Sequence, residues 1–246
     1  MLTVCTGWSP KGWIEYGEAF VHSAARHWSS DIRLLAYVEE LIELPIGECR
    51  SVLQIPGCVE FIDKYRDNKR ANGRDVQPNW KEAAKKRGYH FRWDAWKFCR
   101  QGFIPLAAAQ ECETEYLAWF DADVVTFADV SAEDITSLLP SGYDVAYLGR
   151  PKWSEIGFQL YRLPAALPML EQFSRYYRDE TVFDLHEWHS AYVFDRAREA
   201  TGIAGWNLTP NREGDVWPYT PLSKFSVHLK GDRKGNAKRL AGLHRI

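Results

Sequence analysis

The sequence predicts a single α/β domain with a mostly parallel central sheet flanked by helices. Two short apolar runs, Ile32–Tyr37 (IRLLAY) and Tyr116–Phe120 (YLAWF), are typical of strands that are covered on both faces. Strand-like and helix-like segments alternate from the N-terminus onward, which is the order expected for a parallel sheet. With 246 residues and no internal repeat or linker-like tract, the chain is long enough to form one large domain.

The first elements form a strand–helix–strand unit. Met1–Gly7 (MLTVCTG) is predicted to be a short strand that ends at a glycine. A loop and a helix near Trp13–Trp28 follow, and Ile32–Tyr37 is the second strand. Because a helix that joins two buried strands lets them lie parallel, this order predicts a βαβ unit. The polar, basic stretch Asp63–Tyr89 is predicted to be a loop or helical insertion over the sheet edge.

The remaining elements continue the same alternation. Helical spacing of apolar residues predicts helices over His90–Ala109, Ala165–Tyr177 and Glu187–Ala200. Apolar runs predict strands over Tyr116–Phe120, Asp144–Leu148, Gly157–Tyr161 and Phe225–Leu229. A basic tail that contains glycine follows the last of these strands. No composition shift forces a boundary, so residues 1–246 are predicted to form one domain.

Composition and short motifs exclude several classes of protein. No apolar run is long enough to span a membrane, and the N-terminus lacks the basic-then-apolar plan of a signal peptide, so a cytoplasmic location is predicted. The five cysteines are widely spread without a CxxC pair, which argues against a disulfide framework and a zinc site. The GxGxxG and Walker-lysine patterns are both absent, so neither a dinucleotide site nor a P-loop is predicted.

Basic residues are concentrated in two stretches, although the net charge is only -2. The first comprises Lys64, Arg66, Lys69, Arg70, Arg74, Lys81, Lys85, Lys86 and Arg87. The second comprises Lys230, Arg233, Lys234, Lys238, Arg239 and Arg245. Such patches either attract the phosphates of a nucleotide or nucleic acid, or form a solvated surface. The eleven tryptophans suit stacking on sugar rings, but large aromatic side chains also dominate core packing.

Two carboxylates stand where a buried strand ends. Tyr116–Phe120 runs directly into Asp121-Ala122-Asp123, and ligands of open α/β sheets collect beyond the carboxyl ends of the strands. Two carboxylates separated by one residue are able to share a hard divalent cation through oxygen ligands. That cation would bind diphosphate oxygens and neutralise their charge. The alternative is that both aspartates are solvated turn residues.

The segment YLAWFDADVV resembles the DxD segment of GT-A glycosyltransferases, including the glycogenin-like and galactosyltransferase-like retaining families. Ser226–Gly231 followed by Lys234 is similar to the His-x-x-Gly-x-x-Lys segment of the same families. The resemblance implies a GT-A (Rossmann-like) fold, a nucleoside diphosphate sugar donor such as a UDP-sugar, and a manganese or magnesium ion. It makes His228 the third metal ligand beside Asp121 and Asp123.

The resemblance also implies a set of donor contacts. Phe91–Asp94 with Lys97 resembles the basic helix that precedes the DxD strand. The residues expected to contact the nucleotide sugar are Thr6, Gly7, Trp8, Tyr37, Arg92, Asp94, Lys97, Asp121, Ala122, Asp123, Lys230, Gly231 and Lys234. Residues 1–123 would form the donor half, and residues 124–246 the acceptor half with a metal- and phosphate-binding tail. Asp232 departs from the pattern, because a carboxylate is unfavourable beside a diphosphate.

The stereochemistry of transfer stays open at this stage. An inverting enzyme needs a carboxylate base at the acceptor oxygen, and Glu187 is the first candidate, followed by Asp184, Asp195 and Glu155. A retaining enzyme would not require such a base. The resemblance around His228 favours retention, whereas an acid near Glu187 favours inversion.

Two other functions fit parts of the sequence. FDADVVT also fits the first motif of a haloacid-dehalogenase-type phosphatase, with Asp121 as nucleophile and Asp123 as acid. That motif ordinarily ends the first strand, whereas a complete βαβ unit precedes it here. A non-catalytic nucleic-acid or carbohydrate-binding module would use the basic patches and the aromatic residues. A combined hypothesis is a transferase that glycosylates a polyanion, such as a hydroxylated base in DNA.

Overall fold

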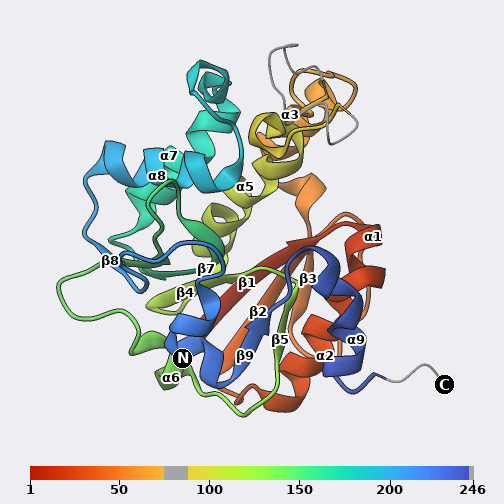
Figure 1. The fold of residues 1–246 in the computed structure, drawn as a ribbon, viewed down its shortest axis with the longest axis vertical. Coiled ribbons are helices and arrows are strands. Elements are labelled where there is room, and N and C mark those ends of the chain that lie inside the picture. Colours follow the sequence, from red (N-terminus) through yellow and green to blue (C-terminus); the bar gives the residue numbers. More distant parts are fainter. Residues whose placement is uncertain (75–87, 244–246) are drawn as a thin grey trace.

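A seven-stranded mixed sheet with the order β3-β2-β1-β4-β7-β6-β8 forms the centre of the computed structural model, which describes residues 1–74 and 88–243 (Figure 1). Its strands are β1 (Leu2–Trp8), β2 (Ile32–Val38), β3 (Glu48–Ser51), β4 (Tyr116–Phe120), β6 (Val145–Leu148), β7 (Glu155–Arg162) and β8 (Gly205–Asn207). A separate antiparallel pair joins β5 (Val124–Thr126) to β9 (Ser226–His228).

Most neighbouring strands of the large sheet are parallel. The pairs β1–β2, β2–β3, β1–β4 and β6–β8 are parallel, whereas β7 runs antiparallel to both β4 and β6. The predicted α/β class with a mostly parallel sheet is therefore confirmed. The apolar runs did not reveal the direction of β7, because a strand covered on both faces has the same composition in either direction.

Helices cover both faces of the sheet. They are α1 (Pro10–Gly12), α2 (Glu18–His27), α3 (Cys58–Tyr65), α5 (Ala95–Glu111), α6 (Ala132–Thr136), α7 (Leu167–Arg178), α8 (Ser190–Thr201) and α9 (Ala237–Leu240). A π-helical turn (Trp13–Gly17) joins α1 to α2. Short 3-10 turns span Val52–Gln54, Phe91–Trp93, Thr181–Asp184, Trp217–Tyr219, Pro221–Lys224 and Gly231–Asn236.

Two large hydrophobic clusters lie on opposite faces of the sheet. One contains buried residues of α3, α5, α7 and α8, and Figure 1 shows these helices together on one side. The other contains residues of α2 and α6 together with Trp217 and Phe225. Side chains that alternate along β1 enter different clusters: Val4 joins the second and Cys5 the first. Burial on both faces explains why the central strands read as continuous apolar runs.

Several element boundaries differ from the prediction. The helix predicted over His90–Ala109 begins at Ala95, because the Asp94 carboxylate caps it by accepting the N–H of Lys97 at 2.9 Å. The helix predicted from Glu187 begins at Ser190. The edge strand β3 was not predicted, and its residues are exposed or half-buried, so it lacks an apolar run. The helix α3 was missed as well.

The predicted insertion Asp63–Tyr89 is described only in part: its start belongs to the end of α3, and residues 75–87 lie outside the described residues. Lys81, Lys85, Lys86, Arg87 and Arg245 of the predicted basic patches also lie outside them. Across 1–74 and 88–243, no helix has the length and apolar character needed to cross a bilayer. Of the five cysteines, Cys5, Cys58 and Cys99 are buried free thiols.

Candidate metal and nucleotide site

The backbone after β4 places two carboxylates at the rim of the sheet. Asp121 N–H donates to the carbonyl oxygen of Gly157 on β7 at 2.9 Å, so the chain stays attached to the sheet for one residue beyond β4. It then turns, and Val124 N–H donates to the carbonyl oxygen of Asp121 at 3.0 Å. This turn leaves Asp121 and Asp123 at the carboxyl end of β4, where parallel sheets bind their ligands.

His228 reaches the same place from the far end of the chain. The β5–β9 pairing sets Val124 opposite His228, and Leu229 N–H donates to the carbonyl oxygen of Asp123 at 2.9 Å. The imidazole is buried, and Trp217 packs against it edge-on with ring centroids 5.2 Å apart. Gly157 leaves the space that this ring needs, because a Cβ on Gly157 would lie 2.4 Å from His228 Cε1.

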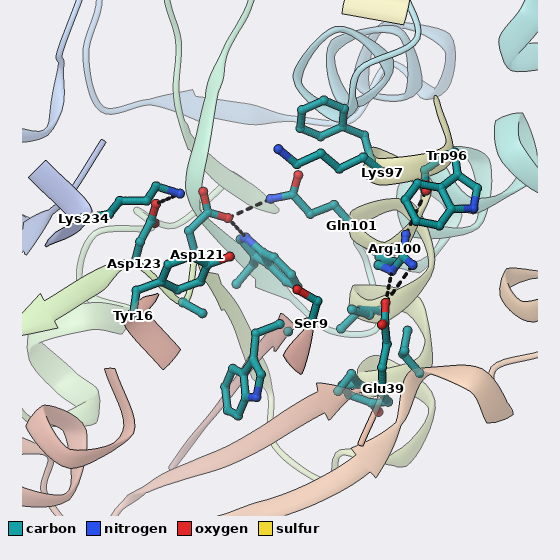
Figure 2. Close-up of a pocket in the computed structure, with 18 residues that line it drawn as sticks. Ser9, Tyr16, Glu39, Trp96, Lys97, Arg100, Gln101, Asp121, Asp123 and Lys234 are labelled. Carbon is teal, nitrogen blue, oxygen red and sulfur yellow. Dashed lines mark hydrogen bonds and ion pairs between the residues drawn. The ribbon is translucent and has the colours of Figure 1, made fainter. Parts of the chain in front are cut away.

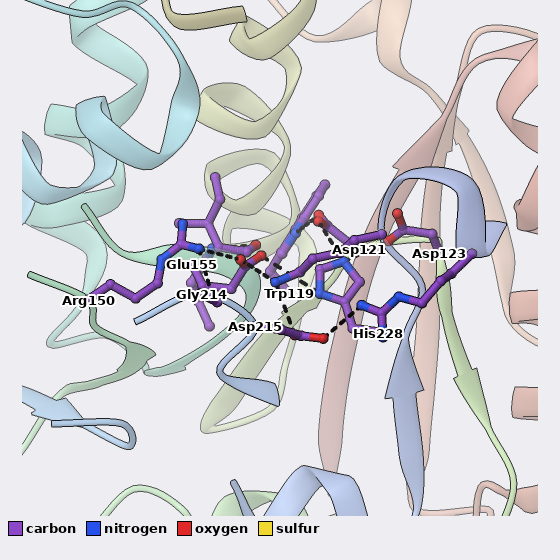
Figure 3. Close-up of polar contacts among 12 residues, drawn as sticks. Trp119, Asp121, Asp123, Arg150, Glu155, Gly214, Asp215 and His228 are labelled. Carbon is purple, nitrogen blue, oxygen red and sulfur yellow. Dashed lines mark hydrogen bonds and ion pairs between the residues drawn. The ribbon is translucent and has the colours of Figure 1, made fainter. Parts of the chain in front are cut away.

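One ligand atom from each of Asp121, Asp123 and His228 lies within 4.8 Å of the others. His228 Nε2 is 2.9 Å from Asp123 Oδ1 and 3.6 Å from Asp121 Oδ2 (Figure 3). Among the described residues, Asp123 Oδ1 is buried without a hydrogen-bond partner, so its close contact with the imidazole lacks hydrogen-bond geometry. Two carboxylates and one imidazole around a common point suit a divalent cation such as Mn²⁺ or Mg²⁺, so this donor set fits a metal ion.

The electrostatics of this cluster indicate that it is adapted to bind positive charge. Burial, reinforced by the neighbouring Asp123, raises the pKa of Asp121 to about 6. Burial also opposes ionisation of Asp123, but His228 and Lys234 outweigh it and lower the pKa of that carboxyl. Burial disfavours the charged imidazole of His228, yet Asp123 and the other nearby carboxylates outweigh it and raise the His228 pKa. In the absence of a metal, protons and Lys234 therefore balance the carboxylates.

Lys234 lies at the open side of this cluster. Its Nζ is 2.6 Å from Asp123 Oδ2 and lies over the Tyr16 ring, 4.6 Å from the centroid. The side chain remains partly exposed, with a relative accessibility of 36%. It comes from the 3-10 turn that follows β9, so the same short segment supplies both the imidazole and this ammonium group.

A cavity of about 450 Å³ opens beside the aspartates at the carboxyl ends of β1, β2 and β4 (Figure 2). Three cations, Lys97, Arg100 and Lys234, line it. Further lining residues are Gly7, Trp8, Ser9, Tyr16, Tyr37, Glu39, Val52, Trp96, Phe98, Gln101, Ile104, Trp119, Asp121, Ala122 and Asp123. A cavity with aromatic walls, cations and a carboxylate cluster at one end suits a ligand with a planar ring and phosphate groups.

Many of the predicted donor-contact residues meet at this cavity. Its lining includes Gly7, Trp8, Tyr37, Lys97, Asp121, Ala122, Asp123 and Lys234. Within the described part of the chain it does not include Thr6, Arg92, Asp94, Lys230 or Gly231. Thr6 is buried in β1, and Gly231 is exposed with φ at 55°. Arg92 lies 3.8 Å from Glu187 and covers the Trp153 ring, away from the cavity.

Asp94 and Lys230 have structural contacts that the sequence did not suggest. Asp94 caps α5 and also accepts the Tyr89 hydroxyl at 2.8 Å. Lys230 Nζ contacts Glu155 at 2.5 Å and Asp215 at 3.4 Å. Glu155 in turn lies 3.7 Å from His228 Nδ1. Lys230 therefore belongs to the ion-pair network behind the imidazole, whereas Lys234 faces the cavity.

The candidate bases lie away from the cavity. Glu187 is buried and contacts His189 Nε2 at 2.9 Å. Burial opposes its ionisation, but His189 and Arg92 outweigh that effect and lower the Glu187 pKa. Asp184 is exposed at the end of the 3-10 turn Thr181–Asp184. The expected position of Glu187 at a helix start is wrong, because the helix begins at Ser190.

Two residues that contact Asp121 were missed. Trp119 Nε1 and Gln101 Nε2 both donate to Asp121 Oδ1, at 2.9 and 2.8 Å. Trp119 precedes Asp121 by two residues, and side chains two positions apart in an extended chain lie on the same face. The contact between Trp119 and Asp121 could therefore have been predicted from the sequence. Gln101 comes from α5, and no local pattern connects it with Asp121.

No protein-family model and no curated protein matches this chain. Solved structures similar to it include a glycosyltransferase involved in the glycosylation of the major capsid of PBCV-1, with a TM-score of 0.44, 14% identity and coverage of 99% of both chains. Mouse xyloside xylosyltransferase 1 matches with a TM-score of 0.46, 11% identity and coverage of 84% of both chains. The Streptococcus pneumoniae TIGR4 glycosyltransferase GlyE matches with a TM-score of 0.43 and 10% identity, over 85% of this chain and 46% of that one. Each of these three structures is of a glycosyltransferase.

Proposed function

We propose that this chain is a metal-dependent glycosyltransferase that moves a sugar from a nucleoside diphosphate sugar to an acceptor hydroxyl. One observation carries the proposal: the ligand atoms of Asp121, Asp123 and His228 meet within 4.8 Å at the edge of a cavity of about 450 Å³. A bound Mn²⁺ or Mg²⁺ would act there as a Lewis acid that neutralises charge on the departing diphosphate.

The side chains around the cavity suit the parts of such a donor. Lys234 now contacts Asp123, and a phosphate would compete for its Nζ once a cation neutralises that carboxylate. Lys97 on α5 offers a second ammonium group to the same ligand. Trp8 and Tyr37 line the cavity at the ends of β1 and β2, where a planar base would stack. We propose UDP as the nucleotide and Mn²⁺ as the preferred cation, in keeping with the resemblance.

A third point concerns the group that would accept the proton of the acceptor hydroxyl. Glu187 and Asp184 stay predictions as bases, and substrate would have to extend beyond the cavity to reach them. Glu155 is closer to the metal ligands, but Lys230 and Arg150 hold it in ion pairs. A retaining reaction needs no protein base at this point. The arrangement favours it, because the carboxylates that line the cavity are the proposed metal ligands Asp121 and Asp123 and the Glu39 side chain, which is ion-paired with Arg100.

The two rival functions receive less support from the geometry. The first motif of such a phosphatase ordinarily ends the first strand, whereas β1, β2 and β3 all precede β4, the strand that Asp121 follows. For a polyanion partner, basic residues of both patches are already paired with acids, as in Lys64–Glu180, Arg66–Asp63 and Arg233–Asp215. Such pairing reduces the net positive field that a nucleic acid would meet. The acceptor is therefore proposed only as a hydroxyl.

Thermal unfolding with and without Mn²⁺, UDP and UDP-sugars tests the proposal. A ligand at 100 times its Kd stabilises the native state by about 2.7 kcal/mol, which raises the Tm of a chain of this size by roughly 5–10 °C. We expect Asp123→Ala to abolish the Mn²⁺-dependent increase while the protein remains folded, with a lower metal-free Tm because His228 and Lys234 lose their carboxylate partner. Asp129→Ala is a matched control, because the Asp129 side chain is 92% exposed and contacts only His27 in the described structure. Retention of the full Mn²⁺-dependent increase by Asp123→Ala would contradict the metal assignment.

A further inference from the structure

We propose that Gln101 and Trp119 are positioning residues that hold one oxygen of Asp121, so that only its other oxygen is presented to the cation. This inference rests on the proposed function, because it assigns separate tasks to the two oxygens of a proposed metal ligand. It is carried by the hydrogen bonds around Asp121, which draw on three elements that are distant in sequence: β4, α5 and α8.

The two oxygens of Asp121 have different surroundings. Oδ1 accepts the Gln101 amide N–H at 2.8 Å and the Trp119 indole N–H at 2.9 Å. A carboxylate offers about four lone-pair sites over its two oxygens, so two donors occupy the capacity of Oδ1. Oδ2 faces the other proposed ligands and is 3.6 Å from His228 Nε2. A cation shared with His228 and Asp123 would therefore bind Asp121 through Oδ2.

The Gln101 side chain is itself held in one orientation. The Ser190 hydroxyl donates to Gln101 Oε1, which leaves the amide nitrogen directed at Asp121 (Figure 2). Ser190 is the first residue of α8 and is buried. The position of α5 is also restricted next to Gln101, because a Cβ on Gly102 would lie 2.6 Å from the Tyr177 ring of α7. Close packing of α5 thus aims Gln101 at the site.

Trp119 supplies the second restraint from the strand itself. It lies in β4 and precedes Asp121 by two residues, and its buried ring is one of the side chains that line the cavity. An indole has a single N–H donor and no acceptor, so Trp119 holds one carboxylate oxygen, and that oxygen is Oδ1. With one donor from the strand and one from a helix, the carboxylate cannot rotate without breaking a partly buried hydrogen bond.

Manganese affinity, measured from the electron paramagnetic resonance signal of free Mn²⁺, tests this inference in the absence of nucleotide. Loss of a residue that orients a metal ligand costs about 10–100-fold in metal affinity. We expect a loss in this range for both Gln101→Met and Trp119→Phe, and a smaller loss for Ser190→Ala. Trp28→Phe is the matched control, because it removes an indole N–H bond to Thr126 Oγ1 away from the cavity.

Unfolding temperatures separate positioning from general stability. We expect Gln101→Met and Trp28→Phe to change the metal-free Tm by similar small amounts, while only Gln101→Met reduces the Mn²⁺-dependent increase. Gln101 is half-buried, so this variant remains informative if Trp119→Phe, in the core, unfolds. Unchanged Mn²⁺ affinity in Gln101→Met would overturn the inference while leaving the proposed function intact. Absence of Mn²⁺ binding by the wild-type protein would overturn both.

Discussion

Adding one methyl group at Gly157 should displace the proposed metal ligand His228 without altering any of the proposed ligand residues. Neither a positive φ nor a turn requires this glycine; the space is required by His228. A Cβ at Gly157 would lie 2.4 Å from Cε1 and 2.6 Å from Nδ1 of the imidazole. Because carbon atoms pack at about 3.5–4.0 Å, the ring or the β7 backbone must move by roughly 1 Å in Gly157→Ala.

The imidazole has little room for such a movement. Trp217 packs against it, and Asp123 and Glu155 lie on its two nitrogen sides at 2.9 and 3.7 Å. Metal–ligand distances tolerate only about 0.2 Å, so a shift of this size removes His228 from the coordination. We therefore expect Mn²⁺ affinity to fall by roughly 100-fold or more, beyond the loss for an orienting residue. Overpacking should also cost about 1–3 kcal/mol of folding free energy.

Gly149→Ala provides the matched control. A Cβ there would lie 2.4 Å from Asn207 Nδ2, which is an equal overlap at the end of the neighbouring strand β6. The two variants should lose similar stability in thermal unfolding, but only Gly157→Ala should lose Mn²⁺ binding in a paramagnetic resonance titration. Wild-type Mn²⁺ affinity in folded Gly157→Ala would refute the assignment of His228 as a ligand held by this packing.

Two further predictions concern protons and phosphates. Asp123 and its neighbours raise the His228 pKa against the effect of burial, so this interaction stabilises the metal-free protein below the ordinary imidazole pKa and is lost as pH rises through the raised value. Because Mn²⁺ must displace that proton, its affinity should increase with pH over the same range. Titration calorimetry in two buffers of different ionisation enthalpy should detect the released proton. Identical heats of binding in the two buffers would contradict proton release. Lys234→Met should weaken UDP binding in the presence of Mn²⁺ by at least roughly tenfold, the effect of losing a hydrogen bond to a charged group. Lys230→Met should weaken it less, because Glu155 holds that ammonium group, and equal losses would show that Lys230 also reaches the phosphates.

Local patterns in the sequence were sufficient to predict the frame of the site. The strands at Ile32–Val38 and Tyr116–Phe120 were recognised because burial on both faces produces apolar runs, and the strand at Leu2–Trp8 was recognised as a short strand-like segment that ends near a glycine. Asp121 and Asp123 were recognised because they follow the last of these runs directly, at the place where the ligands of open α/β sheets collect.

Contacts between distant segments were not predictable in this way. Lys230 and Lys234 stand four residues apart in the same basic tail, yet one pairs with Glu155 behind the imidazole and the other faces the cavity. Asp94 was predicted to contact the nucleotide sugar, but its position at the start of α5 makes it the N-terminal cap of that helix. A side chain has the same charge and the same spacing in the sequence whether it forms a structural contact or faces the cavity. Only the path of the folded chain distinguishes these two roles.

The sequence by itself determined the class of the sheet, which follows from the alternation of buried strands and helices along the chain. It also determined the two aspartates at the sheet edge, because they follow one buried strand directly. Tertiary structure decided which groups surround those aspartates. The β5–β9 pairing places His228 opposite Val124, and the packing of α5 brings Gln101 to Asp121. These neighbours lie far apart along the chain, and their contacts depend on strand pairing and helix packing, which no local pattern of residues records.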